Sequence, residues 1–576
     1  MTNPPLFFRR TLLWLLGLMF CIAASLSSEY LSSELLTPYE FIFLSLLLLL
    51  ISASLFRQIS AGRLNIPLLL LPILIFIFLR IMPVFFSPVL NPHAALSKIA
   101  GLLIGVLFFL SLYQTGFVEY DRLRILLIIF VSGIVQSLIG ISQFFLSCVD
   151  ISPLLIKFKG IPYGSFQQLN LMASWLASCI VISLYLILIG LIDSFGRKSK
   201  LFFIVLTALP CFALPLTGSL TGFLGLIAGI ALISFSSKDL LRQKSRLVQV
   251  WVVVLLFSFT LGITSSYIFK GDSVLVSKTS KLGGRGLDAR IVLYDVGIQM
   301  FRTAPLGHGI GDFSSIYPVY ETRKFRYDLN SEKRMYGSRH PHNEVLYQLV
   351  ESGIPGIVGL FFVSGCFLFY LCRCRRKMAV MFLGLLTPLL IHSMFEYPFY
   401  QSLPHYALFI VLLYLPLLEL RNSWIFMKSE FIKTGLRILI TVAAAVSVIL
   451  VAHTLNGYLK MIQHVKQKAR AGVVDLTLLE NGLHNPYLIN EAERLRMSVM
   501  LDYGERNGIR QVLELVESWS SAEAMRSNSL YAYEMNIRSL IALERFEDAF
   551  RVAERAVAIY PFLAGRLRDI NILKYK

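Results

Sequence analysis

Charged side chains are scarce in this sequence of 576 residues. Asp, Glu, Lys and Arg together make up only 15% of the chain, whereas hydrophobic residues make up 56%. A soluble domain usually carries about a quarter charged residues. The shortage of charge therefore argues against a soluble globular protein. It favours a chain with many membrane-spanning segments, and the mean hydropathy of +0.67 agrees.

Cysteine is also rare, with seven residues in the chain. Most of the seven lie inside apolar runs, so the sequence implies no disulfide framework. Cys372-Arg373-Cys374 falls in a basic turn with no histidine or further cysteine nearby, which argues against a zinc site. Acidic residues are outnumbered, and the net charge is +19. Much of this excess sits in short turns between apolar runs, without a concentrated basic stripe, so we expect no nucleic-acid partner.

Apolar runs are what the sequence has in abundance. A membrane helix needs about 20 mostly apolar residues, and about 13 segments meet this description. The expected spans lie near residues 11–28, 39–56, 64–84, 98–114, 124–147, 168–192, 201–216, 219–236, 248–268, 345–371, 378–395, 403–420 and 436–455. The pair within 201–236 is either two short spans that reverse at residues 216–222 or one long helix that dips and re-enters the bilayer.

Positive charge on short loops orients the spans, because such loops stay in the cytoplasm. The basic turns fall on one side of the membrane if residues 201–236 form a hairpin. They include Arg9-Arg10, Arg122 with Arg124, and residues 197–200, 238–246 and 373–377. The opposite side then receives the loop 269–344, the reversal at 217–222, the turn at 396–398 and the C-terminal tail.

The tail differs from the rest of the chain. After about residue 457 the composition is that of a soluble protein, and apolar residues recur at helical spacing. Residues 542–561 resemble one tetratricopeptide-type helix pair. We therefore expect an all-α, polytopic membrane helix bundle in four parts. Residues 1–268 and 345–456 are transmembrane helices, 269–344 form a large outward loop, and 457–576 form a small outward helical domain.

The stretch Ser338-Arg339-His340-Pro341-His342-Asn343-Glu344 ends the large loop at the edge of a span. Titratable groups at that depth are costly and indicate a functional site. Imidazole accepts a proton from a hydroxyl near neutral pH, which favours a general base. The alternatives are a metal site, for which Glu344 is the only acidic neighbour, and a structural histidine. Asn343 would cap the next helix or orient an imidazole.

Other polar residues gather on the same predicted side. Arg285 and Arg290 follow the end of an apolar span, and guanidinium groups bind phosphate bidentately; a solvated loop or contact with lipid head groups is the alternative. Gln168 and Asn170 open a span, where amides bind sugar hydroxyls or phosphate, or cap the helix. Glu396 closes another span after His392 and would orient a histidine or arginine. Together these residues suggest a site for an anionic substrate.

In chain order, these pieces resemble the bacterial O-antigen ligase and polymerase superfamily, and more narrowly its protein O-oligosaccharyltransferase branch. The ligase signature is His, then Asn, Ser or Gln, nine residues, Gly, two residues, and Gly, Thr or Tyr. Here it is His342-Asn343 followed by Gly353 and Gly356, which makes His340 a supporting residue. Residues 304–313 resemble the superfamily's Pro-Leu-x-Gly-x-Gly segment. The segment 168–170, the turn at 392–398 and the helical tail resemble the protein-glycosylating branch.

One position departs from the family pattern. Family members often carry an arginine in the outward reversal, where this chain has Leu220. The resemblance then leaves phosphate binding to Arg290, to Arg285 or to a loop arginine such as Arg323.

The resemblance implies a transfer that needs neither metal nor cofactor, at the periplasmic face of the bacterial inner membrane. The donor would be a glycan on undecaprenyl diphosphate, and the acceptor a Ser or Thr hydroxyl of an exported protein such as a pilin. His342 would act as general base or orient the acceptor. Arg290 and Arg285 would hold the departing diphosphate, and Gln168 and Asn170 would place the donor head group.

Four alternative functions are weighed at this point. A ligase that puts O-antigen on lipid A core and a polymerase that extends the glycan use the same donor, so composition does not separate them. A transporter would show paired broken helices near the midplane and internal repeats, neither of which the sequence displays. A scaffolding membrane protein that docks through its helical tail is the last alternative.

Overall fold

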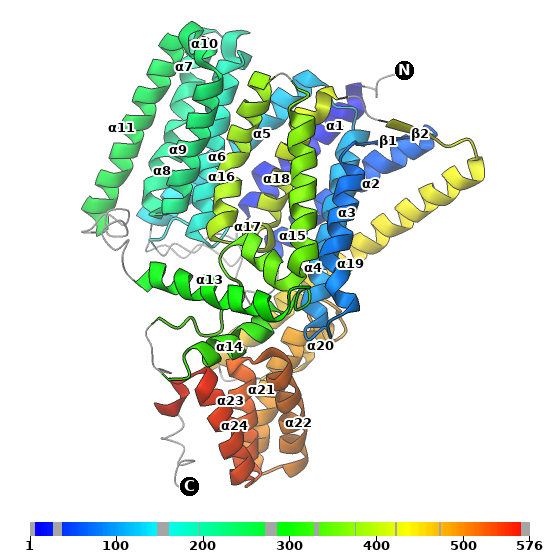
Figure 1. Cartoon of the computed structure of the whole chain (residues 1–576), viewed down its shortest axis with the longest axis vertical. Coiled ribbons are helices and arrows are strands. Elements are labelled where there is room, and N and C mark those ends of the chain that lie inside the picture. Colours follow the sequence, from blue (N-terminus) through cyan, green and yellow to red (C-terminus); the bar gives the residue numbers. More distant parts are fainter. Residues whose placement is uncertain are drawn as a thin grey trace. The chain divides into compact units, whose positions relative to one another are not determined.

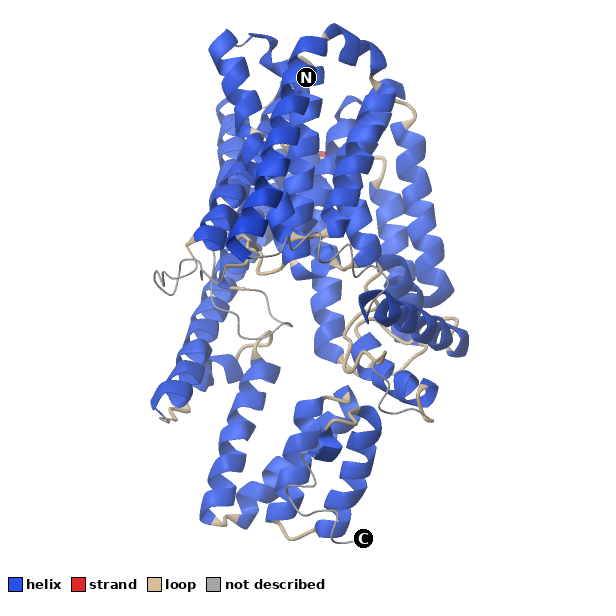
Figure 2. Cartoon of the chain, turned by 90° about the vertical axis from the view of Figure 1, so that its left-hand side faces the viewer, coloured by secondary structure: helices blue, strands red, loops and turns tan. Residues whose placement is uncertain are grey.

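The computed structural model describes residues 6–26, 37–146, 160–194, 196–270, 285–327, 333–374, 376–420, 423–471 and 474–565. Most of this described chain is helical (Figure 2). Its two strands, β1 (Arg63–Ile66) and β2 (Ser423–Phe426), pair antiparallel with Arg63 opposite Phe426. The predicted all-α class is therefore confirmed.

Ten helical segments in the described chain are long and apolar enough to cross a membrane. They are Leu6–Ser25, Pro38–Ser60, Pro92–Gln114, Glu119–Phe145, Leu169–Leu188, Arg197–Thr217, Ser245–Phe269, Glu344–Leu371, Lys377–Phe395 and Glu430–Ala469. Three shorter apolar helices, Leu70–Phe85, Leu220–Ser236 and Leu403–Leu418, occupy the remaining predicted spans. The polytopic helix bundle expected from hydropathy is thus present, with three spans shorter than a bilayer usually requires.

The chain divides into two compact units, each assembled from distant segments. Unit 1 comprises Met1–Ile73, Leu103–Leu282 and Val363–Ala452, and unit 2 comprises Leu74–Leu102, Gly283–Phe362 and His453–Lys576. Four helices run across these divisions: α3 (Leu70–Ile81), α4 (Pro92–Gln114), α15 (Glu344–Leu371) and α19 (Glu430–Ala471). The four-part domain division predicted above remains a prediction.

Unit 1 holds the remaining apolar helices. They are α1 (Leu6–Gly17) with its continuations η1 (Leu18–Ile22) and η2 (Ala23–Ser25), α2 (Pro38–Ser60), α5 (Glu119–Phe145), α6 (Leu169–Leu188), η4 (Leu191–Ser194), α7 (Arg197–Leu206), α8 (Ala208–Thr217), α9 (Leu220–Ser236), α10 (Lys238–Gln243), α11 (Ser245–Lys270), α16 (Arg376–Phe395), α17 (Pro398–Gln401), α18 (Leu403–Tyr414) and η5 (Leu415–Glu419). Helices α5, α8, α9 and α16 pack against α6, whose spanning segment is wholly buried. A helix that is hydrophobic on every side belongs in such a core.

Small residues let α9 approach its neighbours closely. A Cβ added at Gly222 would lie 2.5 Å from that of Ala173 on α6. One added at Gly225 would lie 2.9 Å from Pro388 Cα on α16. In a bilayer, where burial of apolar surface between helices gains little, this close packing is a main source of association.

The uncertain pair within 201–236 is a hairpin. Gly218 ends α8 in the left-handed conformation (φ 60°), and Ser219 caps α9 by accepting from Gly222 N–H. In Figure 1, α7 and α10 lie at the same end of the bundle, so the chain descends through α8 and returns through α9. The structure thus favours the two reversing spans over the single re-entrant helix.

Unit 2 contains helices that the sequence left within a loop. Residues 269–344 include α13 (Arg285–Thr303) and α14 (Phe313–Lys324). The C-terminal part forms α20 (Thr477–Leu483), α21 (Ile489–Asn507), α22 (Arg510–Ser527), α23 (Leu530–Ala542) and α24 (Phe546–Ile559). Ala553 and Ala556 on α24 are buried in one core with Ala532 and Ile537 of α23. The tail is therefore a packed helical domain, as its small residues indicated.

Candidate active site

The histidine turn, which we define as residues 338–343, is built by short-range hydrogen bonds. Ser338 Oγ donates to the His340 carbonyl at 2.9 Å. The backbone N–H of His342 donates to Nδ1 of His340 at 3.1 Å, and the two rings lie 4.1 Å apart. His342 has φ +52°, a left-handed conformation that costs energy for a residue with a side chain. The turn therefore holds the His342 backbone in a strained geometry.

His340 supports the His342 backbone instead of exchanging protons. Its Nδ1 accepts a hydrogen bond, so the neutral ring carries its proton on Nε2. Burial lowers the pKa of His340 to about 2, helped by the neighbouring His342, Lys98 and Arg339. The ring is thus neutral at physiological pH and acts as a fixed hydrogen-bond acceptor. His342, by contrast, is only half-buried.

Asn343 caps α15. Its Oδ1 accepts from the backbone N–H of Leu346 at 2.9 Å, and its carbonyl accepts from Tyr347 N–H. These bonds satisfy donors that a helix start otherwise leaves open. Of the two uses predicted for Asn343, the structure shows the capping one. His342 is therefore the last residue before the cap of a long apolar helix.

The first glycine of the signature, Gly353, interrupts α15. Gly353 has φ 58° and ψ −154°, a backbone conformation that is almost restricted to glycine. The break lets residues 305–309 lie against the helix: Ile354 N–H donates to Pro305 O, and His308 N–H donates to Val350 O. A Cβ on Gly353 would lie 2.3 Å from the Pro305 carbonyl oxygen. Two motifs that lie some 50 residues apart in the sequence are thus in direct contact.

Buried cations and carboxylates surround the first turns of α15. Arg80 pairs with Glu344 at 3.7 Å. Lys98 donates to Glu351 at 2.6 Å and to the Tyr347 hydroxyl at 2.5 Å. The Arg80 side chain is 2% exposed. A buried ion is tolerated only with such partners, so these pairs fix α3 and α4 against the start of α15 within unit 2.

Asp312 extends this polar group towards the Pro-Leu-x-Gly-x-Gly segment. Its carboxylate accepts from the backbone N–H groups of Leu90 and Asn91 at 3.0 and 2.8 Å. Burial raises the pKa of Asp312, while those two hydrogen bonds oppose the rise. Sequence analysis missed Arg80, Lys98 and Asp312. The sequence does carry a signal for Arg80 and Lys98, since each is a single charge within an apolar run and such charges indicate functional sites.

The predicted phosphate-binding arginines lie on two helices of unit 2. Arg290 is half-buried on α13, and Arg323 is exposed at the end of α14, over the ring of Tyr320 at 5.3 Å. Arg285 is the first residue of α13, and its side chain lies outside what the structure describes. Their assignment to phosphate remains a prediction.

Of the two predicted amides, Asn170 meets Glu396 within unit 1. Asn170 Nδ2 donates to Glu396 Oε1 at 3.3 Å, and Ser219 Oγ donates to Asn170 Oδ1 at 2.7 Å. Asn170 thus joins the start of α6, the α8–α9 reversal and the end of α16. Gln168, at the N-cap position of α6, has a buried Oε1 with no hydrogen-bond partner among the described residues. Such an oxygen is available to a hydroxyl or amide donor.

His392, the other predicted residue of that turn, is fully buried in unit 1. Ser174 Oγ donates to the Leu171 carbonyl, so it accepts from His392 Nδ1 at 2.7 Å. This bond anchors the end of α16 to α6. It explains why the turn carrying Glu396 lies beside Asn170.

Ten helical segments of the described chain are able to cross a membrane, and one of them begins just after the strained residue His342. These features define a multi-pass membrane protein with a polar site. The family described as O-Antigen ligase matches residues 202–361, which include His342 and Gly353. The family described as Virulence factor membrane-bound polymerase, C-terminal, matches residues 380–567, which include Glu396 and the tail helices. No curated protein matches the chain.

The two family matches support the ligase and polymerase superfamily for this chain. Its members are membrane glycosyltransferase-like enzymes that use lipid-linked glycans. This superfamily implies a lipid-linked glycan donor and a membrane setting. Gln168 and Asn170 lie outside both matched ranges, and their assignment to donor binding remains a prediction.

Proposed function

We propose that this protein transfers a glycan from undecaprenyl diphosphate to Ser or Thr hydroxyls of an exported protein such as a pilin. The reaction takes place at the periplasmic face of the bacterial inner membrane, without a metal ion. The observation that carries the proposal is the conformation of His342. Its strained backbone is fixed on one side by His340 and on the other by the Asn343 cap. Backbone strain of this kind is found where geometry serves function.

The reaction follows from the chemistry of the site. His342 accepts the proton of the acceptor hydroxyl as its oxygen forms a bond to the anomeric carbon of the glycan. The bond between that carbon and the diphosphate oxygen breaks, and the lipid diphosphate leaves with the electron pair. Arg290, Arg285 and Arg323 neutralise the leaving group, since guanidinium groups remain charged and match phosphate geometry. Gln168 and Asn170 hold the donor head group, and Glu396 orients Asn170 by accepting its hydrogen bond.

Two observations favour a protein as acceptor. The tail is a packed helical domain rather than a short extension, and the Glu396 turn is hydrogen-bonded to Asn170 at the start of α6. Both features resemble the protein-glycosylating branch. A second candidate is a polymerase that extends the glycan, favoured by the polymerase match over the tail. A ligase acting on lipid A core is the third acceptor class that the donor permits.

Identification of the acceptor tests this proposal. Cells that supply one defined lipid-linked glycan and a panel of pilins are compared with and without the protein, by mass spectrometry of the pilins and of the lipopolysaccharide. We expect the pilin to gain the mass of the glycan only when the protein is present. A lengthened lipid-linked glycan with unmodified pilin would support the polymerase instead, and glycan on lipid A core would support the ligase.

A further inference from the structure

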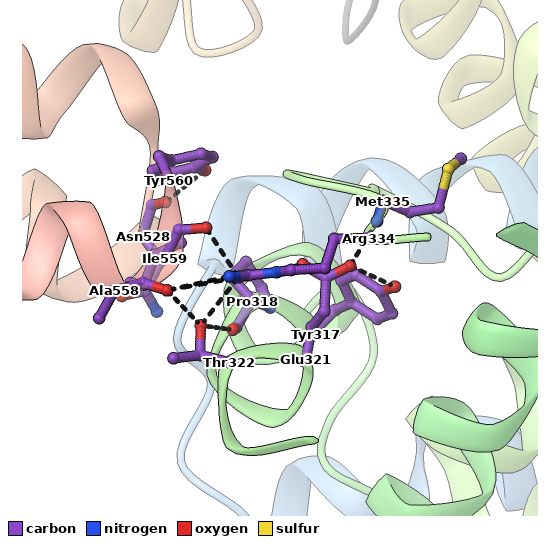
Figure 3. A network of polar contacts seen from close by, with 10 residues as sticks. All are labelled: Tyr317, Pro318, Glu321, Thr322, Arg334, Met335, Asn528, Ala558, Ile559 and Tyr560. Atoms are coloured by element: carbon purple, nitrogen blue, oxygen red, sulfur yellow. Dashed lines mark hydrogen bonds and ion pairs between the residues drawn. The ribbon is translucent and has the colours of Figure 1, made fainter. Parts of the chain in front are cut away.

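One arginine joins the large loop to the end of the tail domain. Arg334 is buried, and its guanidinium donates to the carbonyls of Ile559 at 2.9 Å and of Ala558 at 3.3 Å. Figure 3 shows the side chain stretched between α14 and the last turn of α24. The final carbonyls of a helix lack partners within the helix and carry its negative dipole end. A buried cation is the matching partner for them.

The same arginine is held from the loop side. Glu321 on α14 pairs with Arg334 at 3.6 Å and accepts the backbone N–H of Met335 at 2.5 Å. The Tyr317 hydroxyl donates to Glu321 at 3.2 Å. Burial raises the pKa of Glu321, and the bonds from Met335 and Arg334 oppose this rise. Both the side chain at 334 and the backbone at 335 are therefore fixed.

A second connection runs parallel to the first. Asn528 Nδ2 donates to the Ser315 carbonyl at 2.6 Å, and the Tyr560 hydroxyl donates to the Asn528 carbonyl at 2.9 Å. Asn528 ends α22 in the left-handed conformation with φ 48°. Thr322 Oγ1 also donates to Ala558 O at 3.3 Å. The tail thus contacts α14 and the segment after it through several hydrogen bonds.

The segment that these bonds hold, residues 334–335, leads directly into the histidine turn. Ser338 N–H donates to the Met335 carbonyl at 3.1 Å, which closes a turn immediately after the anchored residues. The Ser338 hydroxyl then donates to His340 O, and His340 Nδ1 accepts from His342 N–H. The contacts are continuous from α24 to His342.

We propose that the C-terminal helical domain positions the histidine turn, and that Arg334 is the positioning residue through which it does so. This inference rests on the proposed function, because positioning matters to a reaction only if His342 performs one. The domain is then part of what keeps the site active, in addition to any contact that it makes with an acceptor. A base displaced by about 1 Å loses about a hundredfold in rate.

The test uses the purified full-length protein and three variants. Arg334→Met removes the cation, Arg334→Lys keeps a charge at the same place, and Arg551→Met is the matched control, an exposed arginine of α24. Trypsin cleavage after Arg339, which is exposed within the histidine turn, measures how firmly the turn is held. Transfer kinetics with a lipid-linked glycan give kcat and the KM for the donor.

We expect Arg334→Met to speed cleavage after Arg339 and to lower kcat about tenfold to a hundredfold, with the donor KM nearly unchanged. Arg334→Lys recovers part of both losses, and Arg551→Met behaves as the original protein. In a His342→Ala background, Arg334→Met lowers kcat no further, because both changes act through one group. Unchanged cleavage, or losses that add in the double variant, would overturn the inference.

Asn528→Gly provides an independent route if Arg334→Met does not fold. Glycine keeps the left-handed backbone at this position but removes the amide that reaches Ser315. We expect faster cleavage after Arg339 in this variant also, and unchanged cleavage would count against the inference. Cleavage is measured without any substrate. An inactive original protein would therefore refute the proposed function and leave this readout intact.

Discussion

The two histidines of the histidine turn have different environments. His340 is 7% exposed and its Nδ1 is committed to the His342 backbone, whereas His342 is half-buried. The sequence spacing to Gly353 already separated the two, and the structure supplies a physical reason. A ring whose pKa lies near 2 cannot exchange protons at neutral pH. Any general base in the turn is therefore His342.

The depressed pKa of His340 predicts a pH-dependent stability. The unfolded chain takes up a proton near pH 6.5 but the folded chain does so only near pH 2, so stability falls as pH falls through this window. The slope is at most about 1.4 kcal/mol per pH unit. His340→Gln keeps an acceptor for the His342 N–H and removes the titration. We expect its melting temperature to decline less than that of the original protein between pH 7 and 5.

His484→Gln, at an exposed histidine of the tail domain, is the control and should keep the original slope. Asp312 and Glu321 act in the opposite direction, because burial raises the pKa of both carboxyl groups. They are present in every variant, so the difference between variants isolates His340. Parallel melting curves for the original protein and His340→Gln would refute this account of the turn.

Among the elements, α15 departs most from what its sequence shows. Glu351, Ser352 and Gly353 interrupt its apolar run, yet we predicted one uninterrupted span over 345–371. The contact that stabilises the break cannot be predicted locally, since Pro305 lies 48 residues before Gly353 and accepts the N–H of Ile354. By contrast, the hairpin of α8 and α9 was among the alternatives because Gly218 and Ser219 are typical turn residues.

Gly353→Ala tests the break. An added Cβ would lie 2.3 Å from Pro305 O and would force a backbone conformation that costs about 1–3 kcal/mol. We expect a lower melting temperature and a loss of transfer activity. Gly365→Ala on the same helix is the control, because its added Cβ meets no atom within 4 Å. Equal melting temperatures for the two variants would show that the interruption at Gly353 is not required.

At the scale of the whole molecule, sequence patterns predicted most of the helices and few of the long-range contacts. Long apolar runs and their basic turns identify spans, because a helix that crosses a bilayer needs about 20 mostly apolar residues. The pairing of Arg334 with Ala558 joins residues 224 positions apart and follows from no local rule. Lys98 and Glu351, 253 positions apart, were missed for the same reason. Orientation in the membrane rests on charge alone.

Labelling of single cysteines tests the orientation. Cys372 is exposed and lies in a basic turn that we place in the cytoplasm, whereas Ala522 is an exposed residue of the tail that we place in the periplasm. Two variants are compared, one that keeps only Cys372 and one that carries only Ala522→Cys. A maleimide that does not cross the inner membrane should label the second in intact spheroplasts, and the first only after lysis. The reverse pattern would place the histidine turn on the cytoplasmic side.

The most direct test of the central claim is transfer by the purified protein in liposomes that contain a defined undecaprenyl-diphosphate-linked glycan and a pilin acceptor. Glycosylated pilin and released undecaprenyl diphosphate are measured together. We predict equal amounts of both products from the original protein, and a loss of about 10²–10⁴ in rate for His342→Ala, with His484→Ala unaffected. Near-normal transfer by a folded His342→Ala protein would contradict the assignment of His342 as the base.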